Sequence, residues 1–82
     1  MNLAELRAAV QQIDKAATLA VRDDALLVTI SNYNVRDRVF ALVNAAGWEF
    51  MRNRRGERVH DFVGWKHNYR HRYIAVPANG TR

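Results

Sequence analysis

The stretch Ala25-Leu26-Leu27-Val28-Thr29-Ile30 decides the fold, because it is a short apolar run with β-branched residues between two polar segments. Such a run is typical of a β-strand that is covered on both faces. It is far shorter than the roughly 20 apolar residues that cross a membrane. We therefore expect residues 25–30 to form a buried strand and the flanking segments to supply the layers that cover it.

An amphipathic helix is predicted before this strand. Asn2 and Glu5 have the spacing of a capping box, and apolar residues follow at positions 3, 6, 10, 13 and 17. The pattern predicts a helix over residues 3–19. The polar segment Arg22-Asp23-Asp24 then predicts a turn into the strand.

A second helix is predicted after the strand, over about residues 34–46. The segment 31–34 supplies turn and cap residues, and apolar side chains at 35, 39, 42, 43 and 46 form one stripe. Gly47 lies where a left-handed residue commonly ends a helix. Because Phe40 lies at the edge of this stripe, we expect Leu42→Ala to cost more stability than Phe40→Ala.

The remaining residues predict strands. Residues 48–53 and 58–63 alternate around a turn at 54–57 that contains Gly56, which is typical of a hairpin. Trp48 and Phe50 share the core face of that hairpin. Residues 69–76 predict a last strand that ends at Pro77, and residues 77–82 are expected to be a frayed tail.

These elements give the order α-β-α-β-β-β and one small basic α+β domain over residues 1–82. The expected fold has two helices packed on one face of a small, mostly antiparallel, three- to four-stranded sheet. The other face would carry part of the Arg, His and Tyr set as a flat or concave cationic surface. A row of Tyr69, His71 and Tyr73 on one face of the last strand is consistent with a stacking platform or with simple packing.

Charge is distributed unevenly along the chain. Residues 1–51 carry five Lys/Arg and six Asp/Glu, whereas residues 52–82 carry eight Lys/Arg and two Asp/Glu, a net charge of +6. Cations in the second half alternate with aromatic side chains, a pattern that suits phosphate backbones and base faces, or an acidic protein surface. The predicted nucleic-acid or partner-binding residues are Arg52, Arg54, Arg55, Arg58, Trp65, Lys66, His67, Tyr69, Arg70 and Arg72. For Trp65 two interpretations stay open: a lid over the core, or an exposed anchor.

Catalytic and metal chemistry is not expected. The chain has no cysteine and no glycine-rich phosphate loop, and its only serine, Ser31, lies outside any nucleophile motif. The histidines at 60, 67 and 71 do not have a known zinc spacing. Asp61 beside His60, or Glu57 facing His71, would suit acid–base work, but an acid among arginines in a hairpin more often forms a cross-strand ion pair. We expect no catalytic residue, no metal, no cofactor and no small-molecule substrate.

Residues 35–77 resemble the core of HicA-type mRNA interferase toxins, which have a double-stranded-RNA-binding-domain-like fold. The matching features are a helix that ends in Ala45-Ala46-Gly47-Trp48, a strand that ends in Arg52, a glycine turn at Gly56, and a third strand that closes in Val76-Pro77. The family's glycine turn leads into a Ser-His pair that carries the catalytic histidine. Here Glu57 and Arg58 follow Gly56, and the nearest imidazole is His60. The resemblance implies an α-β-β-β core and a nucleic-acid partner, without the nuclease activity.

Two functions are predicted. The first is a non-enzymatic binding protein whose basic, aromatic-rich second half docks on nucleic acid, RNA or DNA, or on a nucleoprotein complex. The alternative is a small inhibitor or adaptor of a phage or mobile element, similar to an anti-CRISPR protein, that blocks a host protein surface. With no signal peptide and no membrane span, the expected location is the cytoplasm, which is the host cytoplasm for a phage protein.

Overall fold

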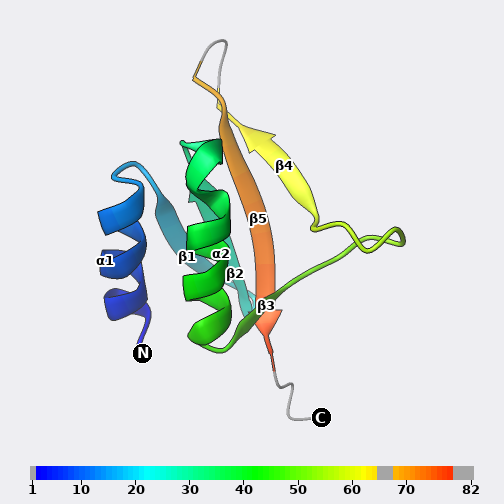
Figure 1. Cartoon of the computed structure of the whole chain (residues 1–82). Helices are drawn as coiled ribbons and strands as arrows, with labels where there is room; N and C mark the ends of the chain where they lie inside the picture. The colour runs from blue at the N-terminus through cyan, green and yellow to red at the C-terminus, as the bar shows by residue number, and fades with distance from the viewer. Residues whose placement is uncertain (1, 65–67, 79–82) are drawn as a thin grey trace.

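The fold is an antiparallel five-stranded sheet with two helices on one face, as seen in a computed structural model that describes residues 2–64 and 68–78. The elements are α1 (Leu3–Ile13), β1 (Thr18–Arg22), β2 (Ala25–Ile30), the 3₁₀ helix η1 (Tyr33–Val35), α2 (Arg36–Ala45), β3 (Trp48–Phe50), β4 (His60–Val63) and β5 (Arg70–Pro77). The sheet order is β1-β2-β5-β3, and β4 also pairs with β5 (Figure 1). The predicted α+β class is confirmed, with five strands in place of three or four.

The strand at residues 25–30 is confirmed, but it is covered on one face only. Leu26, Val28 and Ile30 are fully buried beneath the helices, while the alternate residues are half-buried on the opposite face. That opposite face, called the open face below, carries no helix within the described residues. The expectation that both faces are covered is therefore wrong, and the alternating burial is that of a sheet with one layer of helices.

The predicted helix 3–19 is too long. The capping box between Asn2 and Glu5 is present, but the helix ends at Ile13 and the chain then forms β1. β1 pairs with β2 along its whole length through a two-residue turn at Asp23 and Asp24, both with positive φ as a type I′ turn requires. Pairing with β1 satisfies an edge of β2 that would otherwise be left unpaired.

Asp14 stops α1 and joins it to the sheet. Its carboxylate is 5% exposed and accepts hydrogen bonds from the backbone N–H groups of Ala16, Ser31 and Asn32 and from the Ser31 hydroxyl, at 2.7–3.2 Å. Burial alone would raise the pKa of the Asp14 carboxyl, but the hydrogen bonds from Ser31, Asn32 and Ala16 outweigh it and lower that pKa. Ser31 is thus a turn residue, as predicted.

The second predicted helix is confirmed over Arg36–Ala45, but its buried face differs from the predicted stripe. Val39, Phe40 and Val43 are buried, and Leu42 is only half-buried. Phe40 turns inward because β3 and β5 lie beneath it: its ring centroid is 4.8 Å from those of Phe50 and Tyr73, both edge-on. Gly47 follows the helix with φ of +100°, as expected.

The predicted hairpin of residues 48–53 and 58–63 is confirmed next to its turn, where Arg52 and Arg58 form an antiparallel bridge, and is wrong for its outer residues. β3 and β4 do not pair with each other but occupy the same edge of β5, with Phe50 opposite Ala75 and His60 opposite Tyr73. Between them residues 51–59, called the ribbon below, leave the sheet and turn back (Figure 1). The ribbon is held by the Arg52–Arg58 bridge and by backbone hydrogen bonds between Asn53 and Glu57 and between Val59 and Met51.

The last strand is longer than predicted at its carboxyl end. Pro77 lies opposite Trp48 within β5, and the N–H of Ala78 donates to the carbonyl of Gly47 at 2.8 Å. Residues 77 and 78 are therefore attached to the sheet and are not part of a frayed tail. Residues 79–82 lie outside the described part of the chain.

We expect Phe40→Ala to lower the free energy of unfolding by about 3–5 kcal/mol, and Leu42→Ala by about half as much. The reason is that Phe40 is buried among two other rings, whereas Leu42 keeps part of its surface in water. Urea denaturation of the two variants measures the difference. An equal or larger loss for Leu42→Ala would contradict the observed phase of α2.

Replacing Asp14 with Asn is expected to cost about 1.5–3 kcal/mol, because hydrogen bonds to a buried charge are lost while the shape is kept. Asp37→Asn, on the exposed side of α2, is the control and should change stability by less than about 0.5 kcal/mol. Since the pKa of Asp14 is lowered in the folded state, its stabilisation is present above the usual value of 3.8 and is lost as the pH falls through the folded pKa. Equal stability of both variants in urea would show that Asp14 does not anchor α1.

Candidate functional site

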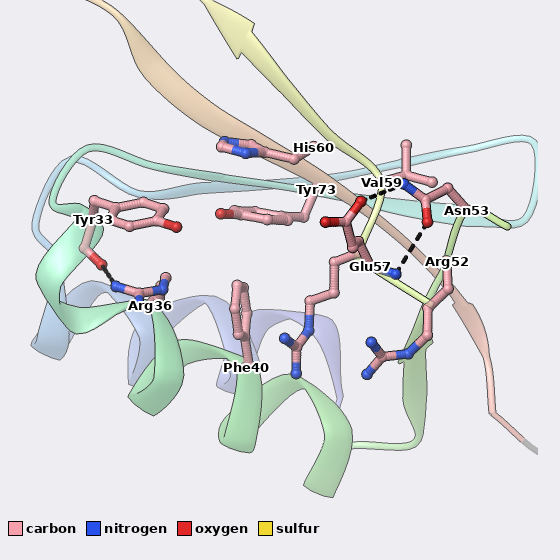
Figure 2. A pocket seen from close by; sticks show the side chains of 10 residues that line it. Tyr33, Arg36, Phe40, Arg52, Asn53, Glu57, Val59, His60 and Tyr73 are labelled. Atoms are coloured by element: carbon pink, nitrogen blue, oxygen red, sulfur yellow. Dashed lines mark hydrogen bonds between the residues drawn. The ribbon is translucent and has the colours of Figure 1, made fainter. Parts of the chain in front are cut away.

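A groove of ≈ 660 Å³ separates the start of α2 from the ribbon. Figure 2 shows its side chains from close by. The lining residues come from η1, α2, the ribbon, β4 and β5, and they are Tyr33, Arg36, Phe40, Arg52, Asn53, Glu57, Arg58, Val59, His60 and Tyr73. Three arginines face a single glutamate here, so the groove carries a positive net charge.

The ribbon presents its arginines from a fixed turn. The Asn53 side-chain oxygen accepts from the N–H groups of Arg55 and Glu57, and Gly56 takes a φ of +82° at the turn. One Nη of Arg52 donates to the carbonyl of Gly56 at 2.6 Å, which closes the ribbon on itself. Arg54 and Arg55 are exposed at the tip. The ribbon therefore holds its cations out from the sheet without a long flexible loop.

Arg58 is the cation that lies deepest in the groove. Its guanidinium carbon lies 4.3 Å from the ring centroid of Phe40 and 5.7 Å from that of Phe50. Its Nε is buried and has no hydrogen-bond partner among the described residues. A cation over aromatic faces is stabilised by the ring quadrupole, and this arrangement fixes its direction.

Arg36 forms the opposite wall of the groove together with Tyr33. Its Nη1 donates to the Tyr33 carbonyl at 3.0 Å, and its guanidinium carbon lies 4.0 Å from the Tyr33 ring centroid. The i, i+3 spacing at a helix start brings the two side chains together. Tyr33 is nevertheless 42% exposed, which leaves ring surface open to solvent.

Rings and imidazoles form a continuous cluster above the groove. His60 stacks on Tyr73 with the ring centroids 4.6 Å apart and the planes 6° apart. His60 Nε2 and His71 Nδ1 are 3.0 Å apart, which is hydrogen-bond distance. Tyr33 contacts His71 at 4.8 Å between ring centroids. Tyr73 itself is only 3% exposed, so for this member of the row Tyr69, His71 and Tyr73 the interpretation as simple packing is confirmed.

The structure separates the predicted binding residues into groups. Arg52 and Arg58 line the groove, and Arg54 and Arg55 lie at the tip of the ribbon. Arg70 and Arg72 lie on the open face, because they alternate with His71 and Tyr73 along β5. Tyr69 is 56% exposed near Phe62, away from the groove. Trp65, Lys66 and His67, including both interpretations of Trp65, lie outside the described residues.

The open face is less cationic than predicted. Arg72 forms an ion pair with Asp61 on the neighbouring strand at 2.7 Å, and this hydrogen bond lowers the pKa of the Asp61 carboxyl. The cross-strand interpretation of Asp61 is therefore confirmed. Glu57 does not face His71, because its carboxylate accepts from the Asn53 side chain within the ribbon. Neither predicted acid–base pair is assembled in the described residues.

Sequence reasoning missed Tyr33, Arg36 and Phe40 as site residues. The sequence predicts a cap segment at Tyr33 and a helix edge at Phe40, and neither pattern indicates a binding site. The only local signal is a ring and a cation three residues apart at a helix start. The groove itself depends on the ribbon folding back toward α2, which no local pattern encodes.

Comparisons of the chain with family models, with curated proteins and with solved structures found no match. The resemblance of residues 35–77 to HicA-type toxins therefore stays a prediction. Within the described residues, no helix is long and apolar enough to cross a membrane, and no three potential ligands gather into a metal cluster.

The lowered pKa of His60 predicts that stability depends on pH. Burial lowers the pKa of His60 below its usual 6.5, and repulsion from His71 lowers it further, against a smaller opposite effect of Asp61. Tyr33 and Tyr73 are the other titratable groups that face the imidazole. Because the unfolded chain binds this proton more readily, the stabilisation is present above about pH 6.5 and is lost as the pH falls through the folded pKa.

The thermal midpoint should therefore decrease as the pH is lowered from about 7.5 to about 5.5. The variant His60→Phe, which keeps a ring stacked on Tyr73, should show a weaker pH dependence. Calorimetry of both proteins across that range measures it. A midpoint that rises on acidification, or an unchanged slope in His60→Phe, would rule out His60 as the responsible group.

Proposed function

We propose that the chain is a non-enzymatic nucleic-acid-binding protein that contacts phosphates with the ribbon and with the adjoining groove. The observation that carries this proposal is the ribbon itself: it projects from the sheet and carries four arginines, at positions 52, 54, 55 and 58. Within the described residues none of the four takes part in an ion pair. Arginines presented in this way suit the planar, bidentate contacts that phosphate groups make.

Geometry supports a nucleic-acid surface more than an ordinary solvated charge run. A two-stranded ribbon has the width that a major groove of B-form DNA admits, about 12 Å. The aromatic groove beside it offers ring surface for unpaired bases, as in single-strand binders. The proposal therefore covers duplexes and single strands. The ribbon contributes the part of the binding affinity that does not depend on the nucleotide sequence.

Removing the two tip charges tests the proposal. The variant Arg54→Gln/Arg55→Gln should bind a generic oligonucleotide about tenfold more weakly at roughly 50 mM salt, and its log K against log salt should be less steep by about 2. The reason is that two phosphate contacts, and the counterions they release, are lost. Fluorescence anisotropy at several salt concentrations gives both numbers.

The matched control is Arg22→Gln/Arg70→Gln, which removes the same charge from exposed positions on the open face. It should keep most of the affinity and most of the salt dependence. Equal loss in the control variant would show that only the net charge matters. No binding by the wild-type protein at low salt would overturn the proposal.

A second candidate function is supported by two exposed rings. Phe62 is 60% exposed and Tyr69 is 56% exposed, and together they line a shallow apolar hollow near the far end of β4 and β5. Exposed rings of this kind anchor protein interfaces. They favour a small inhibitor or adaptor, such as one from a phage or mobile element, that contacts an acidic or nucleoprotein partner. A partner retained after nuclease treatment and lost with Phe62→Ser/Tyr69→Ser would favour this function over the first.

A further inference from the structure

We propose that the groove holds one nucleotide unit, with its phosphate between the guanidinium groups of Arg36 and Arg58. Its unpaired base lies against the ring wall, which is formed by the side chains of Tyr33 and His60. This inference rests on the proposed function and deepens it, because it names an unpaired nucleotide as the ligand of this site. The groove volume of ≈ 660 Å³ lies within the roughly 300–1,000 Å³ of sites for drug-sized ligands.

The positive net charge of the groove favours an anionic ligand. Arg36, Arg52 and Arg58 come from α2 and from both sides of the ribbon, and they line the same groove; Figure 2 labels Arg36 and Arg52. Arg58 makes no hydrogen bond to another described residue, and its Nε is buried without a partner. A guanidinium partly removed from water and without an acidic partner attracts an anion more strongly than an exposed one does. Glu57 is the one opposing charge that lines the groove.

Two tyrosine hydroxyls add neutral donors to the same site. In Figure 2 the hydroxyls of Tyr33 and Tyr73 point toward one another from opposite sides. Burial raises the pKa of the Tyr73 hydroxyl, which therefore stays protonated and able to donate. Within the described residues the Tyr73 hydroxyl makes no hydrogen bond and is not among the buried polar atoms that lack a partner, so it is open to the groove, where a phosphate or sugar oxygen can accept from it.

The ring wall explains why the ligand carries a flat base and is more than inorganic phosphate. Tyr33 keeps exposed ring surface beside the Arg36 guanidinium, and His60 extends the wall above Tyr73. Rings and guanidinium planes are the surfaces on which unpaired bases stack. A base within a duplex has its faces covered by its neighbours, so the site selects a single strand or an unpaired end.

Calorimetric titration of the full chain with adenosine monophosphate, adenosine and inorganic phosphate tests the inference. Adenosine monophosphate should bind at least about tenfold more tightly than either of its parts, because only the whole nucleotide reaches both the arginines and the rings. Equal affinity for inorganic phosphate and adenosine monophosphate would overturn the base contact. No binding of the mononucleotide would overturn the inference as a whole.

Variants place the ligand in the groove. Arg58→Met keeps the packing on Phe40 and should weaken mononucleotide binding on the order of tenfold, and Tyr73→Phe, which loses only the hydroxyl, should weaken it by a few-fold. Glu57→Gln should strengthen it by removing the opposing charge. Arg38→Gln, also on α2 but outside the groove lining, is the matched control and should bind as the wild type does. If Arg38→Gln and Arg58→Met lose the same affinity, the groove is not the site.

Titrations with oligonucleotides distinguish this inference from the proposed function. They also show whether the groove binds a free nucleotide or a nucleotide within a strand. A single strand with a terminal phosphate, the same strand without it, and a duplex are each titrated with the wild type and with Arg58→Met. We expect Arg58→Met to abolish the preference for the single strand, while the affinity for the duplex falls by no more than the roughly threefold expected for one lost phosphate contact. If all three bind equally and Arg58→Met changes nothing, the inference fails while nucleic-acid binding stands. If none binds, both fail.

Discussion

β5 is the strand on which the rest of the structure depends, because it is hydrogen-bonded on both edges. β2 pairs with residues 71–75 on one edge, while β4 and β3 pair in succession with residues 70–73 and 75–77 on the other. β3 and β4 run end to end along this edge, separated on β5 by residue 74 alone, whereas residues 51–59 lie between them in the chain. The chain between them must leave the sheet and return, and this excursion is the ribbon. The same excursion places Arg52 and Arg58, at the base of the ribbon, beside α2.

Tyr73 lies at the centre of that arrangement. It pairs with Val28 on β2 and with His60 on β4, and its ring packs edge-on against Phe40 and Phe50. The core and the candidate site thus share one side chain: its ring fills the space beneath α2, and its hydroxyl lines the groove. Aromatic contacts of this geometry contribute about 0.5–1.5 kcal/mol each beyond the area they bury. The floor of the groove is consequently part of the core.

Local chemistry explains which elements could be predicted from the sequence. The strand at 25–30, the start of α1, the span of α2, and the glycines at 47 and 56 follow from short-range signals that the structure keeps. β1 was missed because Ala17 continues the helical spacing of apolar residues, and because its hairpin turn uses two aspartates where glycine or asparagine is more usual. Phe40 was misplaced because its burial depends on rings from β3 and β5, which lie elsewhere in the sequence.

The uneven distribution of charge along the sequence does not match the distribution of charge on the folded surface. Arg70 and Arg72 belong to the basic half, yet the alternation of β5 places them on the open face, where Asp61 neutralises Arg72. Arg36 belongs to the neutral half but joins Arg52 and Arg58 in the groove. The cationic surface that supports the proposed function is therefore made by the ribbon and α2 together. Composition alone indicates a basic partner-binding half, but only the strand register shows which cations share a surface.

The most direct test of this account is a map of backbone amide chemical shifts by nuclear magnetic resonance during titration with a short single-stranded oligonucleotide. The account predicts that the shifts change along the ribbon, at Tyr33 and Arg36, and at His60, while α1 and the open-face residues of β1 and β2 stay unchanged. Changes centred on Arg22, Arg70 and Arg72 instead would place binding on the open face and contradict it.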